Sequence, residues 1–359
     1  MYILLDKKYA SKSIISSVLN GISAVTKRKK VEIFCTDNAE KIPNGTKIAI
    51  VVGFSQKWQQ EAVEVLNARG IHPLILGFTV YDMCLPYSCV TFDFLRSMHS
   101  LTEELLKKKR GKIAFLGYNP DSLSDKMKLA GVQAAARKYG ETVTVFENKG
   151  DITLCLEQFL RYGKTIDNIV CGNDYIAVLL CVFYFDAVKD KNLCSCAKST
   201  LSDYACLPYP SCLIDYYKAG EVLARLYFVL LNLEEIHPLT ATLEMKILTE
   251  NGKFKSAYRT HFSKRGEYVN FYGDVRVKEA ECLDAMLCSC DDLDFQIING
   301  MMQGYSYEKL AEILPMAVNT IKYRVRMMTE RADVKGKKDL LSVLKKFHIN
   351  LSDGRKNEN

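Results

Sequence analysis

The sequence predicts an α/β protein in which two similar lobes, each built on a doubly wound parallel sheet, precede a small all-α domain. Short apolar runs alternate with helical stretches over residues 1–249, an order typical of parallel sheets covered by helices. The alternation starts again after residue 100, which indicates a second sheet. Near the C-terminus the pattern changes to short helices without strands. With 359 residues, the chain is long enough for two or three domains.

The first lobe is expected to begin with five strands and two helices. Apolar runs predict strands at residues 2–5, 31–35, 47–53, 72–77 and 90–93. Helical spacing predicts helices at residues 11–27 and 56–69. The run at 47–53 is apolar throughout, as in a strand that is buried on both faces.

The second lobe repeats this order, and the chain then continues through one more helix and one more strand. Strands are expected at residues 112–117, 142–146, 167–171, 211–215 and 243–248. Helices are expected at residues 101–109, 124–139, 152–161, 175–188 and 219–233. Residues 251–281 are irregular in pattern, so we expect the two-lobed part to end at 275 and a linker to occupy 276–292. The last segment, 350–359, is expected to be a disordered tail.

Residues 293–334 carry three helical apolar runs within the length of a helix-turn-helix. Gly304 separates the first run from the second, and Pro315 separates the second from the third. Ser306 is placed to cap the N-terminus of the second helix. The domain is expected to span 293–349.

The third of these helices has two faces. Its apolar stripe, expected to pack on the other two helices, consists of Val318, Ile321, Val325 and Met328. Its polar face offers Asn319, Thr320, Lys322, Tyr323 and Arg326. Cations hold phosphates, and amide and hydroxyl groups read base edges. We expect Lys322 and Arg326 to contact double-stranded DNA, with Asn319 and Tyr323 as candidates for base contacts. The alternative is an ordinary solvated basic face.

The net charge of +7 is concentrated in the same region. Residues 293–349 contain ten Lys or Arg and six Asp or Glu, so four of the seven excess charges fall in these 57 residues. A basic excess at this place favours an anionic partner such as DNA.

The C-terminal segment resembles the DNA-binding domain of LuxR-type regulators. The resemblance rests on the turn Gly304-Tyr305-Ser306 and on Thr320-Ile321-Lys322, which is similar to that family's Thr-Val-Lys signature. It implies that a fourth helix at residues 339–347 is a dimer contact, and hence that the protein is a homodimer. Ala317 stands where the family commonly has a capping Ser or Thr.

The first 249 residues resemble the type I periplasmic-binding-protein fold, as used in the sensor domains of lac-repressor-type regulators. Residues 122–135 are similar to that family's Ser-x-x-x-Arg-x-x-Gly-Phe segment, with Lys128 in place of the Arg. Gly172-Asn173-Asp174 is similar to its Asn-Asp pair. The resemblance implies three crossings between the lobes, expected near Asp93, Pro208 and Pro238. Lobe 1 would then comprise about 1–93 and 209–238, and lobe 2 about 94–208 and 239–275.

A small-molecule effector is expected to bind between the lobes, because open α/β sheets bind ligands beyond the C-terminal ends of their strands. That rule selects Asp6, Lys7, Phe54, Ser55, Phe92, Asp93, Asn119, Asn173 and Asp174. The resemblance adds Asp125, Lys128, Asp203 and Tyr204. Carboxylates and amides beside aromatic rings suit a sugar-like or nucleoside-like molecule. Each of these residues has an alternative role as a strand-end cap or loop residue.

Motifs for catalysis are missing from the sequence. It has no GxGxxG after a strand, no GxSxG and no HExxH, and Gly163-Lys164-Thr165 lacks the earlier glycine of a phosphate-binding loop. We therefore expect no enzyme, no cofactor and no metal. A phosphorylated receiver domain is disfavoured because Lys7 follows Asp6 where an acidic pair is needed.

The compartment is expected to be the cytoplasm. No apolar run approaches the length of a membrane span, and the first residues do not have the pattern of a signal peptide. The thirteen cysteines are scattered, which favours reduced thiols used as small apolar residues, with a redox sensor at Cys288 and Cys290 as a minor hypothesis.

The sequence thus favours a ligand-responsive transcription regulator. Two alternatives stay open. One is a small-molecule-binding module whose C-terminal helices only dimerise, and the other is an α/β enzyme with its active site between the lobes.

Overall fold

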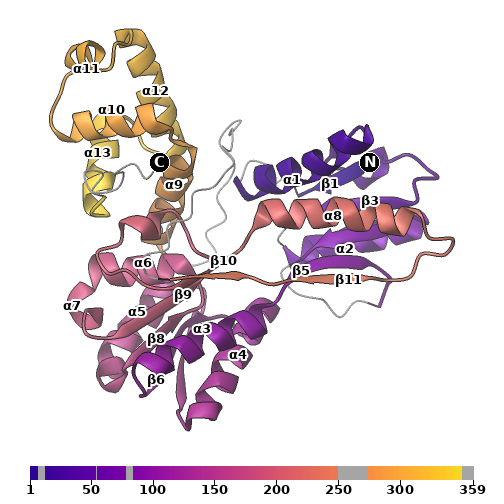
Figure 1. The fold of residues 1–359 in the computed structure, drawn as a ribbon, viewed down its shortest axis with the longest axis horizontal. Coiled ribbons are helices and arrows are strands. Elements are labelled where there is room, and N and C mark those ends of the chain that lie inside the picture. Colours follow the sequence, from indigo (N-terminus) through magenta and orange to yellow (C-terminus); the bar gives the residue numbers. More distant parts are fainter. Residues whose placement is uncertain (7–12, 54, 78–83, 250–272, 350–359) are drawn as a thin grey trace.

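The computed structural model describes residues 1–6, 13–53, 55–77, 84–249 and 273–349. Two α/β lobes lie side by side, and a group of helices from the end of the chain sits on one of them (Figure 1). Each lobe contains a six-stranded sheet. The expected fold class is confirmed.

Lobe 1 has a sheet in the order β11-β5-β4-β3-β1-β2, with every pair parallel. Its strands are β1 (Tyr2–Leu5), β2 (Phe34–Thr36), β3 (Ile48–Val52), β4 (His72–Leu76), β5 (Ser88–Phe92) and β11 (Thr240–Leu243). All five residues of β3 are buried, as its unbroken apolar sequence predicted.

Helices cover both faces of this sheet. Helices α1 (Ser13–Lys29) and α8 (Tyr216–Leu231) pack together on one face, while α2 (Gln56–Ala68) and the short 3-10 helix η1 (Ala39–Lys41) cover the other. Two glycines allow the first pair to approach closely. A Cβ atom on Gly220 would lie 2.0 Å from the Val18 carbonyl oxygen, and one on Gly21 would lie 2.0 Å from that of Tyr217.

Lobe 2 has the strand order β12-β10-β9-β8-β6-β7, parallel except for β12. Its strands are β6 (Ile113–Tyr118), β7 (Val143–Glu147), β8 (Asn168–Cys171), β9 (Asn192–Cys196), β10 (Ser211–Leu213) and β12 (Lys246–Leu248). Helices α3 (Phe94–Lys108) and α4 (Leu123–Tyr139) cover one face. The opposite face carries α5 (Ile152–Tyr162), the 3-10 turn η2 (Gly163–Thr165), α6 (Asp174–Phe183) and α7 (Phe185–Val188).

In the residues that the structure describes, the chain crosses between the lobes three times, but two crossings differ from expectation. The first, at Asp93, joins β5 to α3 as expected. Because β10 pairs with β9 in lobe 2, the second crossing follows Leu213 and not Pro208. The third lies between Leu243 and Lys246, where the strand expected at 243–248 divides into β11 and β12, one in each sheet. The expected lobe boundaries at 209 and 238 are therefore wrong.

Other element boundaries also change. Strand β9 has no counterpart in the prediction, α3 begins at Phe94 and not at residue 101, and the helix expected at 175–188 breaks at Tyr184. The linker expected at 276–292 is instead almost entirely helical, because α9 runs from Val275 to Ser289.

The C-terminal helices, defined here as α9 to α13, continue with α10 (Asp292–Met302), α11 (Tyr307–Ile313), α12 (Val318–Arg331) and α13 (Lys337–Lys346). The predicted capping by Ser306 is confirmed, since its side chain accepts a hydrogen bond from the Lys309 amide at 3.2 Å. Gly304 has φ +88° in the turn before it. Helix α12 begins at Ala317 with no side-chain cap.

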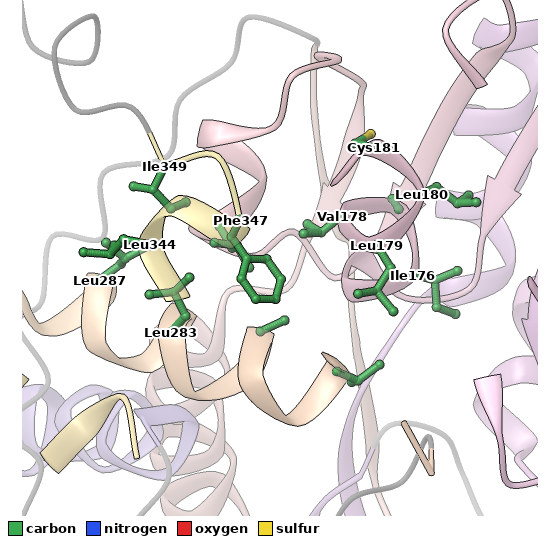
Figure 2. Close-up of a cluster of buried hydrophobic side chains, with 14 of the residues drawn as sticks. Ile176, Val178, Leu179, Leu180, Cys181, Leu283, Leu287, Leu344, Phe347 and Ile349 are labelled. Carbon is green, nitrogen blue, oxygen red and sulfur yellow. The ribbon is translucent and has the colours of Figure 1, made fainter. Parts of the chain in front are cut away.

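The C-terminal helices share one apolar core with lobe 2. Buried residues of α6 and of β6 and β8 belong to the same contiguous cluster as buried residues of α9 to α13. Figure 2 shows part of it, formed by Ile176, Val178, Leu179, Leu180, Cys181, Leu283, Leu287, Leu344, Phe347 and Ile349. The apolar side of α13, expected to contact a second copy, is therefore covered by α6 and α9 of its own chain.

Candidate DNA-contacting helix and sensor site

Helix α12 separates its side chains as the sequence predicted. Ile321, Val325 and Met328 are buried against the other C-terminal helices. The polar residues are all exposed: Asn319, Thr320, Lys322, Tyr323 and Arg326. The helix therefore presents an amide, hydroxyl groups and two cations to solvent on a folded support.

Arg326 is partly oriented by its own helix. Its guanidinium carbon lies 5.3 Å from the centre of the Tyr323 ring, and its Nε atom lies 3.7 Å from Glu330 Oε1. Contacts of this kind at an exposed site are weak. They direct the side chain without removing its charge from solvent.

Arg324, on the same helix, turns inward. Its Nη1 atom lies 2.7 Å from Asp294 Oδ1 and 3.0 Å from Asp291 Oδ1, both at the start of α10. The hydrogen bonds that Arg324 donates to Asp294 and Asp291 raise the pKa of its guanidinium despite its partial burial. This cation joins α12 to α10 and is not part of the exposed face.

In lobe 1, the predicted sensor residues lie at strand ends, as expected, and several of them cap helices. Ser55 accepts from the Trp58 amide at 3.5 Å at the start of α2, and Asp93 accepts from the Arg96 amide at 3.0 Å at the start of α3. Asp6 is only 3 % exposed, and Phe92 is buried against the rings of Phe94 and Tyr216. Lys7 and Phe54 lie outside the described residues.

In lobe 2, Asn119, Asp125 and Lys128 come together. Lys128 Nζ donates to Asp125 Oδ1 at 2.9 Å and to the Gly172 carbonyl oxygen at 2.9 Å, while the Asn119 amide donates to Asp125 Oδ2 at 3.2 Å. Burial alone would lower the pKa of Lys128, but Asp125, together with Cys196 and Cys212, outweighs burial and the pKa is raised. The Lys128 charge therefore joins α4 to the end of β8.

Lys128 also reaches the first crossing between the lobes. Its Nζ atom lies 5.2 Å from the centre of the Phe94 ring, the first residue of α3 after Asp93. The ends of β5 and β8, next to which predicted residues lie, are thus linked through one buried cation.

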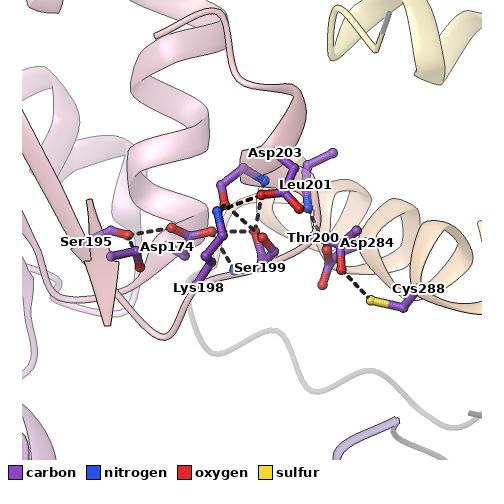
Figure 3. A network of polar contacts seen from close by, with 11 residues as sticks. Asp174, Ser195, Lys198, Ser199, Thr200, Leu201, Asp203, Asp284 and Cys288 are labelled. Carbon is purple, nitrogen blue, oxygen red and sulfur yellow. Dashed lines mark hydrogen bonds and ion pairs between the residues drawn. The ribbon is translucent and has the colours of Figure 1, made fainter. Parts of the chain in front are cut away.

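Asp174 is completely buried and accepts three hydrogen bonds from donors of its own lobe. It accepts from Ser195 Oγ at 2.5 Å, from the Ser199 amide at 2.7 Å and from Ser199 Oγ (Figure 3). Asn173 caps α6 by accepting from the Tyr175 amide at 2.9 Å. In this conformation Asp174 joins α6 to β9 and to the segment after β9, all in lobe 2.

Asp203 and Tyr204 lie nearby in the 3-10 helix η3 (Leu201–Tyr204). Lys198 Nζ lies 2.8 Å from Asp203 Oδ1 and donates to Ser202 Oγ at 2.9 Å. The predicted residues Asp174 and Asp203 are therefore brought together by the segment that follows β9.

The sequence analysis missed the polar groups of α9. Asp284 Oδ1 accepts from the Leu201 amide at 2.8 Å, and its Oδ2 accepts from Tyr175 Oη at 3.1 Å. Burial raises the pKa of Asp284 to about 7, despite these two hydrogen bonds. The sequence does contain a pattern that indicates this helix, because Val277, Ala280, Leu283 and Leu287 have helical spacing. Asp274 stands at the N-cap position.

None of the thirteen cysteines, all of which lie in the described residues, forms a disulfide bond, and eight of them are buried. Burial raises the pKa of Cys288 well above its usual range, while Thr200 Oγ1 lies 2.8 Å from its sulfur. A raised pKa lowers the fraction of reactive thiolate, which disfavours a redox role for this residue. Within the described ranges, no three His, Cys, Asp or Glu side chains are placed to hold a metal ion.

Within the part of the chain that the structure describes, no helix is long and apolar enough to cross a bilayer. No protein-family model matches the sequence, and no curated protein does.

Solved structures with a similar fold include transcription regulators. A LacI-family regulator from Enterococcus faecium with bound ribose has 14 % identity, a TM-score of 0.56, and coverage of 71 % of this chain and 100 % of that chain. CcpA of Lactococcus lactis has 17 % identity, a TM-score of 0.56, and coverage of 71 % and 99 %. The regulator CelR in complex with cellobiose has 13 % identity, a TM-score of 0.56, and coverage of 70 % and 84 %. The lobes of this chain therefore have the two-lobed fold of LacI-type regulators.

Proposed function

We propose that this chain is a ligand-responsive, DNA-binding transcription regulator, with a two-lobed sensor that controls a C-terminal helix-turn-helix of the LuxR type. The observation that carries the proposal is the exposed face of α12. Asn319, Lys322 and Arg326 project to solvent from a helix whose opposite side is anchored in the core of the sensor's second lobe. Such a helix suits the major groove of DNA.

The similar folds support the sensor half of the proposal. Two of the regulators compared above have ribose or cellobiose bound, and a polyhydroxylated effector suits the carboxylate and amide groups at the strand ends of these lobes. Because Asp174 and Lys128 are engaged inside lobe 2, we assign effector contacts first to the half-buried groups Asp93, Asn119 and Asn173.

We propose a regulator and not an enzyme, because the solved structures compared above are transcription regulators. A role for the C-terminal helices in dimerisation alone is less favoured, because the apolar side of α13 is covered within the chain. Two copies would bind half-sites about one helical turn apart, and they would associate through a surface other than that side of α13.

The experiment is a fluorescence anisotropy titration with labelled DNA from upstream of the protein's own gene. We expect binding that persists in an excess of unrelated competitor DNA, because base contacts add to the phosphate contacts. Complete loss of binding in the competitor would contradict sequence-specific recognition.

A further inference from the structure

A short segment of lobe 2 joins the buried carboxylate Asp174 to helix α9. The segment consists of Ser199 and Thr200, which precede η3, and Leu201, the first residue of η3; it is called the connector below. Figure 3 shows it between the end of β9 and α9. Each of its residues makes a polar contact with one of these two neighbours.

At one end, the connector is bound to the ligand-facing end of the sheet. The amide of Ser199 donates to Asp174 Oδ2 at 2.7 Å, and its hydroxyl donates to the same oxygen. Asp174 Oδ1 accepts from Ser195 Oγ, and Ser211 Oγ lies 2.7 Å from the same serine oxygen, which can accept its proton. This end therefore gathers groups from α6, β9 and β10.

At the other end, the connector holds α9. The Leu201 amide donates to Asp284 Oδ1 at 2.8 Å, and Thr200 Oγ1 lies 2.8 Å from Cys288 Sγ. Asp284 and Cys288 are four residues apart, so they are neighbours on one face of the helix. A parallel contact runs from Tyr175, next to Asp174 in sequence, to Asp284 Oδ2 at 3.1 Å.

Helix α9 in turn contacts the candidate DNA-contacting helix. It packs against α12 in the shared core. Arg331, the last residue of α12, donates from Nη1 to Ser289 Oγ at 2.8 Å, and Lys278 Nζ lies 3.2 Å from Asp333 Oδ2 just beyond it. If α9 is displaced, these direct contacts can therefore move α12 with it.

We infer that the connector is the link through which the ligand end of lobe 2 controls the position of α9 and of the C-terminal helices. The inference rests on the proposed function for its biological meaning. Its physical basis is the cost of leaving a buried polar group without a partner. A shift of Ser199 that follows a change at Asp174 breaks the hydrogen bond from the Leu201 amide to Asp284 Oδ1 unless α9 moves with it.

The test perturbs one end of the connector and reads the other. Ser199→Ala removes the hydroxyl donor to Asp174 while leaving the Leu201 and Thr200 contacts in place. The readout is the alkylation rate of each cysteine in the full-length protein with iodoacetamide, resolved by peptide mass spectrometry. We expect Cys288 to react about fivefold faster, the change that corresponds to about 1 kcal/mol for one lost hydrogen bond.

Two internal references separate this link from general loosening. The core thiols Cys155 and Cys171 lie in the same lobe and are fully buried, so they are expected to keep their rates. The matched variant Ser97→Ala, at a buried serine of α3, is expected to leave Cys288 unchanged. An unchanged Cys288 in Ser199→Ala, or an equal rise at Cys155 and Cys171, would overturn the inference.

A second readout distinguishes failure of the link from failure of the proposed function. The cysteine assay uses no DNA, so it holds even if the wild-type protein binds none. If the wild-type protein binds the labelled upstream DNA, Ser199→Ala is expected to change its affinity about fivefold as well. Faster alkylation at Cys288 with unchanged DNA affinity would show that the link ends at α9, contrary to the inference.

Discussion

Arg324 and Arg326 lie two positions apart on α12, but their surroundings give them different roles. Arg324 is held by two carboxylates of α10, whereas the side chain of Arg326 is 64 % exposed and has only a distant carboxylate partner. The sequence predicted the exposed face correctly from helical spacing. It could not assign Arg324, because the positions of Asp291 and Asp294 depend on the packing of α10.

For the candidate sensor residues, too, the sequence indicated the positions but not the contacts. The rule of strand ends found Asp174 and Asp93 in places where the lobes' strands end, as expected. The family resemblance added Lys128, which lies in α4 and whose amino group reaches the end of β8. The sequence could not show that donors of the same lobe engage Asp174, because Ser195 lies in a strand that was not predicted and Ser199 follows that strand.

At the residue scale, Asp284 is expected to make stability depend on pH. Its pKa is raised from 3.8 to about 7 in the folded protein, so the folded state binds one more proton than the unfolded state between these values. The free energy of unfolding therefore falls as pH rises from about 4 to about 7, by up to about 1.4 kcal/mol per pH unit. Asp284→Asn is expected to remove this component.

Urea unfolding of both proteins at several values between pH 5 and pH 8 measures the difference. Asp190→Asn, at an exposed position, serves as the control and is expected to keep the wild-type slope. If the free energy of unfolding has the same slope against pH in wild type and in Asp284→Asn, the pKa of the Asp284 carboxyl group is not raised by burial.

At the scale of elements, most helices and strands of the lobes could be predicted, and the failures have physical causes. Strand β9 reads Asn-Leu-Cys-Ser-Cys, which is neither clearly alternating nor continuously aliphatic. The sequence predicts a linker at the position of helix α9, because lysine and glutamate interrupt the apolar residues of this segment. The sheet to which β10 belongs depends on the path of the whole chain.

The N-terminus of α12 allows a direct test of helix capping. Ala317 has φ −63° and ψ 138° with no side-chain cap, whereas Ser306 caps α11 with a similar backbone conformation. Ala317→Ser is expected to stabilise the protein by about 1 kcal/mol, because the hydroxyl oxygen can accept from the Thr320 amide. Ser306→Ala is expected to destabilise it by a similar amount. Thermal unfolding checks both, and a lower Tm for Ala317→Ser would contradict this geometry.

At the scale of the whole molecule, lobe 2 and the C-terminal helices form one body. An apolar stripe in the sequence of α13 shows that the helix must be covered, but not what covers it. The resemblance to LuxR-type domains implied a second copy, whereas in the structure Phe347 packs edge-on against Phe183 of lobe 2, with their ring centres 5.8 Å apart.

This shared core predicts that damage to α13 spreads into lobe 2. Phe347→Ala is expected to cost about 3–5 kcal/mol and to lower hydrogen-exchange protection in α6, α9 and α13 together, with a smaller effect in α2 of lobe 1. Phe34→Ala removes a ring that is 48 % exposed and is expected to change little. Loss of protection confined to α13 would contradict a common core.

The central claim, that α12 contacts DNA, is tested most directly by the salt dependence of DNA binding. Lys322→Ala combined with Arg326→Ala removes the two exposed cations of the helix, and Lys27→Ala with Arg28→Ala removes the same charge from an exposed end of α1. The measurement is fluorescence anisotropy on the upstream DNA at increasing salt.

We predict weaker binding for the first double variant, with the slope of log K against log salt reduced by about 2, because each lost phosphate contact removes about 0.9. The second double variant should keep the wild-type slope. If the first variant binds as tightly as wild type with the same slope, α12 is not the DNA-contacting helix.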